Sequence, residues 1–221
     1  MRPLTDHTPK PLLQVGGKSL IRYLVEALVK AGLHDLVLNH SYLGEQIITE
    51  LGDGRVLGAR IIYSAEPEGA LETGGGMLRA LPLMGTGPFV AVNADIWTDY
   101  PFGQLPDNPP GLAHLVLVDN PAHHPHGDFV LKGGRVFDLP VGNADGGVQL
   151  TFSGIGVYRP ALFANCAQGR FPLAPVLRSA MARGEVTGEH YRGRWVDIGT
   201  PERLADLNRE LSRTVGASSR D

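Results

Sequence analysis

The first hundred residues alternate helix patterns with short strand patterns, and this alternation restricts the possible folds more than any other feature. Helix patterns, with apolar residues at spacings of three and four, cover residues 19–31, 43–51 and 75–83, and strand patterns cover 36–38, 59–63 and 89–92. Gly32 directly follows the first helix pattern, as helix-ending glycines do. Strands and helices that alternate at these lengths predict right-handed βαβ units on a mostly parallel central sheet flanked by helices.

After Asp99 the alternation gives way to a proline-rich loop and closely spaced strands. We expect strands over 113–118, 129–131, 135–137, 148–152 and 155–158, and helices over 160–166, 173–182 and 200–211. Lys132-Gly133-Gly134 lies between two of these strands and predicts a hairpin. This half is expected to form a small α/β extension over one edge of the sheet. A single domain should cover residues 1–213, and residues 214–221, which have no apolar pattern, should form a disordered tail.

Composition excludes several classes of protein. Lys and Arg number 20 against 23 Asp and Glu, so the net charge is −3 with no basic run, which argues against a nucleic-acid-binding protein. The single cysteine, Cys166, excludes an internal disulfide framework and a cysteine-rich zinc module. The apolar stretches are far shorter than the ~18 residues that a membrane helix needs. We therefore expect a cytoplasmic protein without a nucleic-acid or membrane partner. The sequence gives no oligomeric state, and a monomer is the simpler expectation.

Lys10 lies between two prolines near the start of the chain. Each proline fixes its own φ near −65° and restricts the residue before it, so the lysine projects from a stiff backbone. A point cation on a rigid support suits a phosphate group. The alternative is a solvated lysine in a proline-rich turn.

Three glycines follow Thr73 in the segment from Leu71 to Gly76, between a predicted strand and a predicted helix. Glycines there allow a ligand to approach the backbone, and the helix N-terminus beyond them offers free N–H groups. An ordinary flexible connection is the alternative, because a glycine cluster alone is a weak signal.

Two aspartates occupy positions that suit a metal ion. Asp95 follows the strand over 89–92, and ligands of open α/β sheets bind beyond the carboxyl ends of strands. Asp197 alternates with Val196 and Ile198, so it points away from them, just before the helix start at Thr200. Mg²⁺ is usually held by one or two carboxylates together with substrate phosphates. A turn aspartate and a helix-start aspartate are the alternatives, and the pair is convincing only if the fold brings the two together.

Two further features carry less chemistry. His123, His124 and His126 surround a proline that breaks the regular spacing of metal ligands, so a polar loop is favoured over a metal site. Cys166 has no activating partner in the sequence, which argues against a reactive thiol.

Several strings together resemble the sugar-1-phosphate nucleotidyltransferase superfamily. Residues 1–5 with 9–12 are similar to the second half of its signature, and residues 93–95 and 195–200 are similar to its two metal-acid motifs. Within the superfamily the resemblance is to the uridylyltransferases of N-acetylmuramate 1-phosphate. It rests on residues 71–76, 93–100, 120–129, 152–158 and 188–200 and covers the chain to about Leu211.

The resemblance implies a Rossmann-like nucleotidyltransferase fold, with the α/β extension binding sugar. It implies a reaction in which UTP and N-acetylmuramate 1-phosphate give UDP-N-acetylmuramate and pyrophosphate, in the recycling of peptidoglycan sugars. By carry-over Lys10 contacts phosphate, Thr73, Gly74 and Asn93 bind the nucleotide, Asp95 and Asp197 hold Mg²⁺, and Asn120, Asp128 and Gly154 face the sugar. A sibling such as a mannose-1-phosphate guanylyltransferase, or an inactive nucleotide-sugar-binding module, stays open.

The start of the chain departs from the family pattern. Family members carry a strand and a Leu-Ala-Ala-Gly-x-Gly-x-Arg loop immediately before the residue that matches Met1. The loop amides and its arginine grip the triphosphate, and the strand lies within the sheet. We therefore expect residues 1–221 alone to be inactive and of low stability, and roughly a dozen upstream residues that encode the strand and loop to restore both properties.

Overall fold

The computed structural model describes residues 1–67, 71–139 and 146–218, with the backbone alone for 214–218. These residues separate into two compact units. The first unit contains residues 1–67, 94–103 and 194–218, and the second contains 71–93, 104–139 and 146–193. The two units are therefore interleaved along the chain, which alternation of helix and strand patterns cannot reveal.

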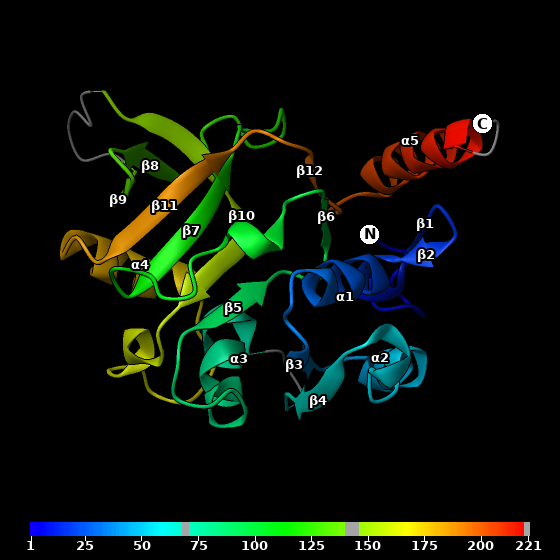
Figure 1. Ribbon diagram of the computed structural model, residues 1–221, viewed down its shortest axis with the longest axis horizontal. Coiled ribbons are helices and arrows are strands. Elements are labelled where there is room, and N and C mark those ends of the chain that lie inside the picture. Colours follow the sequence, from blue (N-terminus) through cyan, green and yellow to red (C-terminus); the bar gives the residue numbers. More distant parts are fainter. Residues whose placement is uncertain (68–70, 140–145, 219–221) are drawn as a thin grey trace. The chain divides into compact units, whose positions relative to one another are not determined.

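A six-stranded sheet forms the centre of the second unit, and Figure 1 shows its strands β7, β10 and β11 as long arrows. Its strands are β5 (Phe89–Val92), β7 (Ala113–Val118), β8 (Phe129–Lys132), β9 (Arg135–Asp138), β10 (Val148–Tyr158) and β11 (Val186–Tyr191). The order is β5-β10-β7-β11-β9-β8, and β10 also pairs with β8.

The expectation of a mostly parallel sheet is wrong for this unit. Only the β7–β11 pair is parallel among the pairs described here, and β10 runs antiparallel to β5, β7 and β8. The reason is that the β8–β9 hairpin reverses the chain before β10 enters between β5 and β7. Strand direction depends on this connection, so the apolar patterns alone do not set it.

Helices cover one face of this sheet and close its core. They are α3 (Glu72–Ala80), α4 (Leu173–Ala182) and the short 3-10 turns η3 (Leu81–Leu83) and η5 (Pro160–Phe163). Leu115 and Leu117 of β7 point to this face, and Leu177 of α4 packs in the same cluster; all three are almost completely buried. The core of the unit therefore lies between β7 and the helices of one face.

The first unit combines three helices with three two-stranded sheets (Figure 1). The helices are α1 (Leu20–Lys30), α2 (Gly44–Leu51) and α5 (Pro201–Ser218), with 3-10 turns η1 (Lys10–Leu12) and η2 (Arg55–Leu57). The strand pairs are antiparallel β1 (Gln14–Val15) with β2 (Lys18–Ser19), parallel β3 (Asp35–His40) with β4 (Arg60–Ala65), and antiparallel β6 (Ile96–Thr98) with β12 (Trp195–Asp197). A further turn, η4 (Phe102–Gln104), lies where the chain passes to the second unit.

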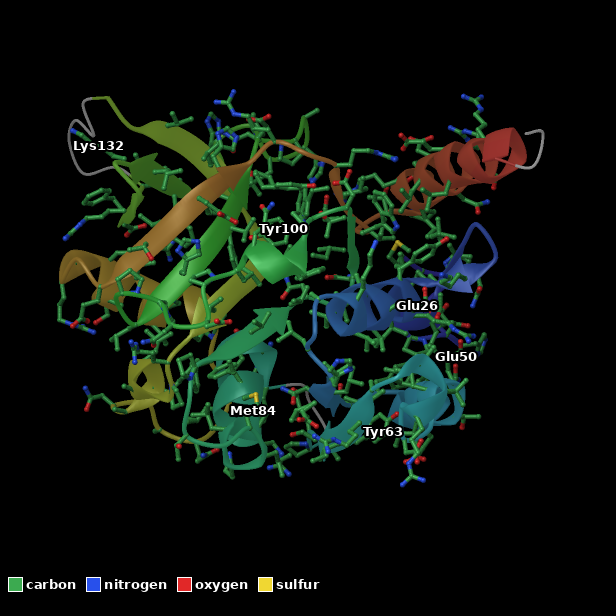
Figure 2. The ribbon with its side chains drawn as sticks, viewed as in Figure 1. Glu26, Glu50, Tyr63, Met84, Tyr100 and Lys132 are labelled. Carbon is green, nitrogen blue, oxygen red and sulfur yellow. The ribbon has the colours of Figure 1, made fainter. Side chains whose placement is uncertain are left out.

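Two hydrophobic clusters hold this unit together. Ile21 and Val25 of α1 pack with Ile47 of α2 and Ile61 of β4. At the edge of this group the Tyr63 hydroxyl, labelled in Figure 2, donates a hydrogen bond to the carbonyl of Gly52 (2.6 Å). The other cluster joins the first hairpin to α5 and includes Val15, Leu20, Ile198, Leu207 and Leu211. Because α1 contributes to both clusters, it links the parallel strand pair to the region around α5.

Most expected elements are present, with four differences. The strands expected over 148–152 and 155–158 form one strand, β10, with a register shift between Phe152 and Ile155. Helix α3 begins at Glu72 rather than Gly75, and the turn η5 is shorter than the helix expected over 160–166. Helix α5 continues to Ser218, past the start of the expected tail, whose residues 219–221 lie outside the described part. No helix among the described residues is long and apolar enough to cross a membrane.

Candidate active site

A short two-stranded ribbon in the first unit carries both candidate metal-binding aspartates. β6 and β12 pair antiparallel, with Asp197 opposite Ile96. One residue further, the backbone N–H of Ile198 donates to the carbonyl oxygen of Asp95 (2.8 Å). Asp95 and Asp197 therefore meet at the same end of one ribbon, although 101 residues of chain separate them.

Arg194 anchors the ribbon to the C-terminal helix α5. Its backbone N–H donates to Asp99 Oδ1 (2.7 Å), and its carbonyl accepts from the Thr98 hydroxyl (2.8 Å). Its guanidinium lies 4.8 Å from the centre of the Trp97 ring and pairs with Glu210 of α5 (2.5 Å). A cation over an indole face is attracted by the ring quadrupole, so these contacts restrain the ribbon from two sides.

Burial around Asp197 fixes the direction of its side chain. Ile198 is completely buried in the cluster that contains Leu20 and Leu207, and Val196 packs against the same cluster. Successive side chains of a strand point to opposite faces, so Asp197 between them points the other way. Its side chain is 31% exposed.

Lys10 lies beside Asp95. Pro9 has an extended backbone and Pro11 stands within the turn η1, so the lysine projects from a stiff segment. Its Nζ lies 3.5 Å from Asp95 Oδ2, and both side chains are close to half exposed. A contact that open leaves both groups accessible to a ligand. The structure thus brings Lys10 into the same site as Asp95 and Asp197.

Arg203 belongs to this site, and the sequence analysis did not identify it. Its Nη1 donates to Oδ1 (2.5 Å) and also to Oδ2 of Asp197. The residue stands in the first turn of α5, where helix electrostatics favour acidic side chains. A basic residue in the first turn of a helix is therefore the sequence feature that points to Arg203.

The donor set at the ribbon end suits Mg²⁺. The ion prefers oxygen ligands and is usually held by one or two carboxylates together with waters and substrate phosphates. Asp95 and Asp197 supply two partly exposed carboxylates, which fits that pattern. Within residues 1–67, 71–139 and 146–218 no group of three or more His, Cys, Asp or Glu side chains forms a protein-only cage. An ion at this place would therefore complete its coordination with phosphate and water oxygens.

Asn93 and Gly154 meet in the second unit. The Asn93 backbone N–H donates to the Gly154 carbonyl (2.9 Å), and Gly154 has φ of +80° in the irregular part of β10. A Cβ added at Gly154 would lie 2.7 Å from Asn93 Nδ2. Both the backbone conformation and this close approach require glycine. The Asn93 side chain is thus positioned by the irregularity in β10.

Asn120 and Asp128, the expected sugar-facing residues, hold a turn together. The Asn120 amide donates to the carbonyls of Pro125 (3.2 Å) and Gln149 (3.1 Å) and accepts from the Thr151 hydroxyl (2.9 Å). Asp128 accepts from the backbone N–H of Phe152 (2.8 Å) and pairs with His124 Nε2 (3.0 Å). The polar loop at His123, His124 and His126 is therefore tied to β10 through these two side chains.

Thr73 and Gly74 lie in the first turn of α3 rather than in a loop before it. A Cβ added at Gly74 would lie 2.5 Å from the Phe171 ring, and one at Gly75 would lie under 3.0 Å from the Gly169 carbonyl oxygen. Protein atoms therefore fill the space that we expected these glycines to leave for a ligand. The conformation just before Thr73 is also unusual, because Glu72 has φ of +59°. Such conformations are costly for residues other than glycine and concentrate at functional sites.

Replacing Glu72 measures the cost of that conformation. Glu72→Ala and Glu72→Gly both remove the ion pair with Arg170 (2.9 Å), but glycine alone adopts positive φ without steric cost. We expect the glycine variant to be more stable than the alanine variant by about 1 kcal/mol in urea denaturation. Equal unfolding midpoints would show that the backbone at this position is not strained.

Comparisons with known proteins place the chain in a family. The nucleotidyl transferase family model matches residues 1–119. The chain is 47% identical to the N-acetylmuramate alpha-1-phosphate uridylyltransferase of Neisseria meningitidis serogroup B, over 93% of this chain and 90% of that protein. It is 32% identical to the protein of the same name in Caulobacter vibrioides, over 91% of this chain and 88% of that protein.

The fold is also that of a solved structure. HddC from Yersinia pseudotuberculosis complexed with GMP-PN superposes with a TM-score of 0.76 at 18% identity, over 96% of this chain and 93% of that one. The expected α/β nucleotidyltransferase fold class is therefore confirmed, apart from the parallel character of the sheet. Because the family model matches more than half of the residues and a relative 47% identical spans nearly all of them, this chain belongs to the nucleotidyl transferase family.

Proposed function

We propose that this chain transfers a uridylyl group from UTP to N-acetylmuramate 1-phosphate, giving UDP-N-acetylmuramate and pyrophosphate. The observation that carries the proposal is the pair of aspartates at one end of the β6–β12 ribbon with Lys10 beside them. The choice of substrates is supported by the relative that is 47% identical, an N-acetylmuramate alpha-1-phosphate uridylyltransferase. The reaction would return a peptidoglycan sugar to the nucleotide-sugar pool, and the expected cytoplasmic location is part of the proposal.

The chemistry needs little covalent help from the protein. An oxygen of the sugar phosphate attacks the α-phosphorus of UTP in line, a new P–O bond forms, and the bond to the β-phosphate breaks. The attacking oxygen is already anionic near pH 7, so no general base is required. Positioning and neutralisation of the developing negative charge are then the main contributions of the site.

Each site residue has a proposed part in this reaction. Asp95 and Asp197 would hold Mg²⁺, which when bound neutralises phosphate charge and orients the reacting groups. Lys10 adds a cation on a stiff support at the same place, and its loose contact with Asp95 leaves the ammonium free to turn to a phosphate oxygen. These three residues form the proposed catalytic group.

Further residues that we propose for nucleotide and sugar binding belong to the second unit. Thr73 and Asn93 would contact the nucleotide, with Asn93 held by the close approach of Gly154, and Gly74 would do so only through its backbone, because Phe171 fills the space beside its Cα. The side chains of Asn120 and Asp128 are hydrogen-bonded to other parts of the protein. We therefore propose that they act on sugar binding indirectly, by holding the shape of the turn between them. Gly154 would admit the sugar at the irregular part of β10.

A substrate panel tests the proposal. The protein, expressed from its complete gene, is assayed for pyrophosphate release with UTP, GTP, CTP and dTTP against several sugar 1-phosphates. We expect the highest kcat/KM for UTP with N-acetylmuramate 1-phosphate. A preference for GTP with mannose 1-phosphate would assign a sibling reaction, and binding of UDP-sugar without pyrophosphate release would indicate a binding module. Either result would contradict the proposal.

Replacing Lys10 separates its charge from its shape. Lys10→Ala should lower kcat/KM by roughly 10- to 100-fold, the worth of a charge-assisted contact. Lys10→Arg should restore only part of this loss, because a planar guanidinium cannot reproduce a point charge. The control is Lys30→Ala, at the exposed end of α1, which should leave turnover unchanged. Full activity of Lys10→Ala would remove this residue from the site.

A further inference from the structure

The first turn of helix α5 contains a cation, the Arg203 side chain, at a place where helix electrostatics favour an anion. Glu202 follows the rule, and its pKa is lowered first by its own backbone N–H and then by the Thr200 hydroxyl. Arg203, the next residue, contradicts the rule. Its backbone N–H donates a hydrogen bond to the Thr200 hydroxyl oxygen (3.3 Å), and this bond fixes the backbone from which the side chain extends. A positive charge here needs a compensating anion.

Asp197 is that anion. Arg203 Nη1 donates to both of its carboxylate oxygens, and the two side chains are 24% and 31% exposed, so water reaches them only in part. A Cβ added at Gly199 would lie under 3.0 Å from Arg203 Nη2. The absence of a side chain at Gly199 therefore makes room for the guanidinium over the chain that links Asp197 to α5.

The same two oxygens are the ligands that a divalent ion would use. A carboxylate has about four lone-pair positions, and the guanidinium occupies positions on both oxygens of Asp197. A divalent cation and a guanidinium on one carboxylate also repel each other. At Asp95 the cation is held more loosely, since Lys10 Nζ is 3.5 Å from Oδ2. Competition between protein cation and metal ion is therefore strongest at Asp197.

We propose that Arg203 competes with the divalent ion for Asp197. The guanidinium holds the carboxylate in place while no metal is bound, and it leaves the carboxylate when the ion binds. Arg203 is thus a positioning residue that sets the metal concentration at which the site becomes filled. This inference rests on the proposed function, because it takes Asp197 as a metal ligand.

Direct titration with Mn²⁺ tests the competition without any turnover. Free Mn²⁺ is measured by electron paramagnetic resonance, up to millimolar concentrations and without nucleotide, with protein expressed from the complete gene. Arg203→Gln should bind Mn²⁺ about tenfold more tightly than the wild type, because a neighbouring like charge is removed. The matched control is Arg209→Gln, which removes the same charge from the same helix at its pair with Asp206. It should match the wild type within about twofold.

The outcomes separate a competing residue from a structural one. The proposal would be overturned if Arg203→Gln bound Mn²⁺ no more tightly than the Arg209→Gln control. It would also be overturned if neither of these two variants bound Mn²⁺. Melting temperatures establish that each variant is folded. If Arg203→Gln does not fold, Arg203→Lys keeps the charge but replaces the planar guanidinium whose Nη1 contacts both oxygens. Tighter Mn²⁺ binding by that variant supports the proposal, and unchanged binding overturns it.

Asp197→Asn in the same titration distinguishes this inference from the proposed function. If that variant binds Mn²⁺ as the wild type does, Asp197 is not a ligand, and the metal assignment of the proposed function fails together with this inference. If Asp197→Asn weakens binding while Arg203→Gln does not strengthen it, only the competition proposed for Arg203 fails.

Discussion

Asp95→Asn and Asp197→Asn should each lower kcat by about 10²- to 10⁴-fold at saturating Mg²⁺. Asparagine keeps the size of the side chain but removes the negative charge that would hold the ion. Both carboxylates are partly exposed at the end of the β6–β12 ribbon, and water can solvate the cations that they leave. The folded structure should therefore persist, with a melting temperature close to that of the wild type for Asp95→Asn and a lower one for Asp197→Asn, which removes the charge that pairs with Arg203.

The control for this prediction is an aspartate outside the site. Asp206→Asn removes the same charge from the exposed side of α5, where Asp206 pairs with Arg209, and should leave kcat unchanged. Initial rates and melting temperatures are measured for the three variants and the wild type. A rate near that of the wild type for either site variant would exclude that aspartate from the reaction.

The second large effect is expected at Gly75, and its sign is opposite to what helix propensity predicts. Alanine inside a helix is ordinarily about 1 kcal/mol more favourable than glycine. A Cβ at Gly75, however, would lie under 3.0 Å from the backbone oxygen of Gly169 and 3.1 Å from Leu71 Cβ. The Gly75 N–H also donates to the Phe171 carbonyl (3.1 Å), so the two segments cannot separate without losing that bond. We expect Gly75→Ala to lower the free energy of unfolding by about 3 kcal/mol.

Urea denaturation measures this effect against a matched substitution. Gly87→Ala places the same methyl group where no atom lies within 4 Å, at a glycine without positive φ, and should change the stability by less than about 0.5 kcal/mol. A Gly75→Ala protein as stable as the Gly87→Ala protein would show that α3 and the segment at Gly169 are not packed as described.

The sequence predicts elements with a sustained apolar period and misses those without one. Residues 19–31 and 173–182 predict α1 and α4 because their apolar residues recur on one helix face. β6 and β12 contain three residues each, which is too short for any period to be visible. The ribbon that brings Asp95 and Asp197 together therefore could not be predicted from patterning. It forms through pairing between segments about a hundred residues apart.

The glycines of the 71–76 segment show a different limit. A glycine cluster indicates that something approaches the backbone closely, but it does not say whether that is a ligand or the protein. Here Phe171 and Gly169 take the place, and their packing allows α3 to start at Glu72 despite the poor helix propensity of glycine. Identifying this partner requires the tertiary structure, because nearly a hundred residues separate the two segments.

Arg203 shows what sequence reasoning could have added. Asp197 is indicated by its strand position and its likeness to a motif, while Arg203, six positions later, falls within the helix predicted over 200–211. A cation in the first turn of a helix is electrostatically unfavourable, and a nearby anion offsets this cost. The structure supplies that anion in Asp197, and the exception thus belongs to the candidate site.

In the proposed reaction an oxygen of the sugar phosphate attacks the α-phosphorus of UTP. The most direct test uses N-acetylmuramate 1-phosphate with oxygen-18 in its phosphate oxygens, incubated with UTP, Mg²⁺ and the protein expressed from its complete gene. Phosphorus NMR of the nucleotide-sugar product should show oxygen-18 in the bridge between its two phosphates, with one pyrophosphate released for each product formed. A product whose bridging oxygen carries no label, or no product at all, would exclude this reaction.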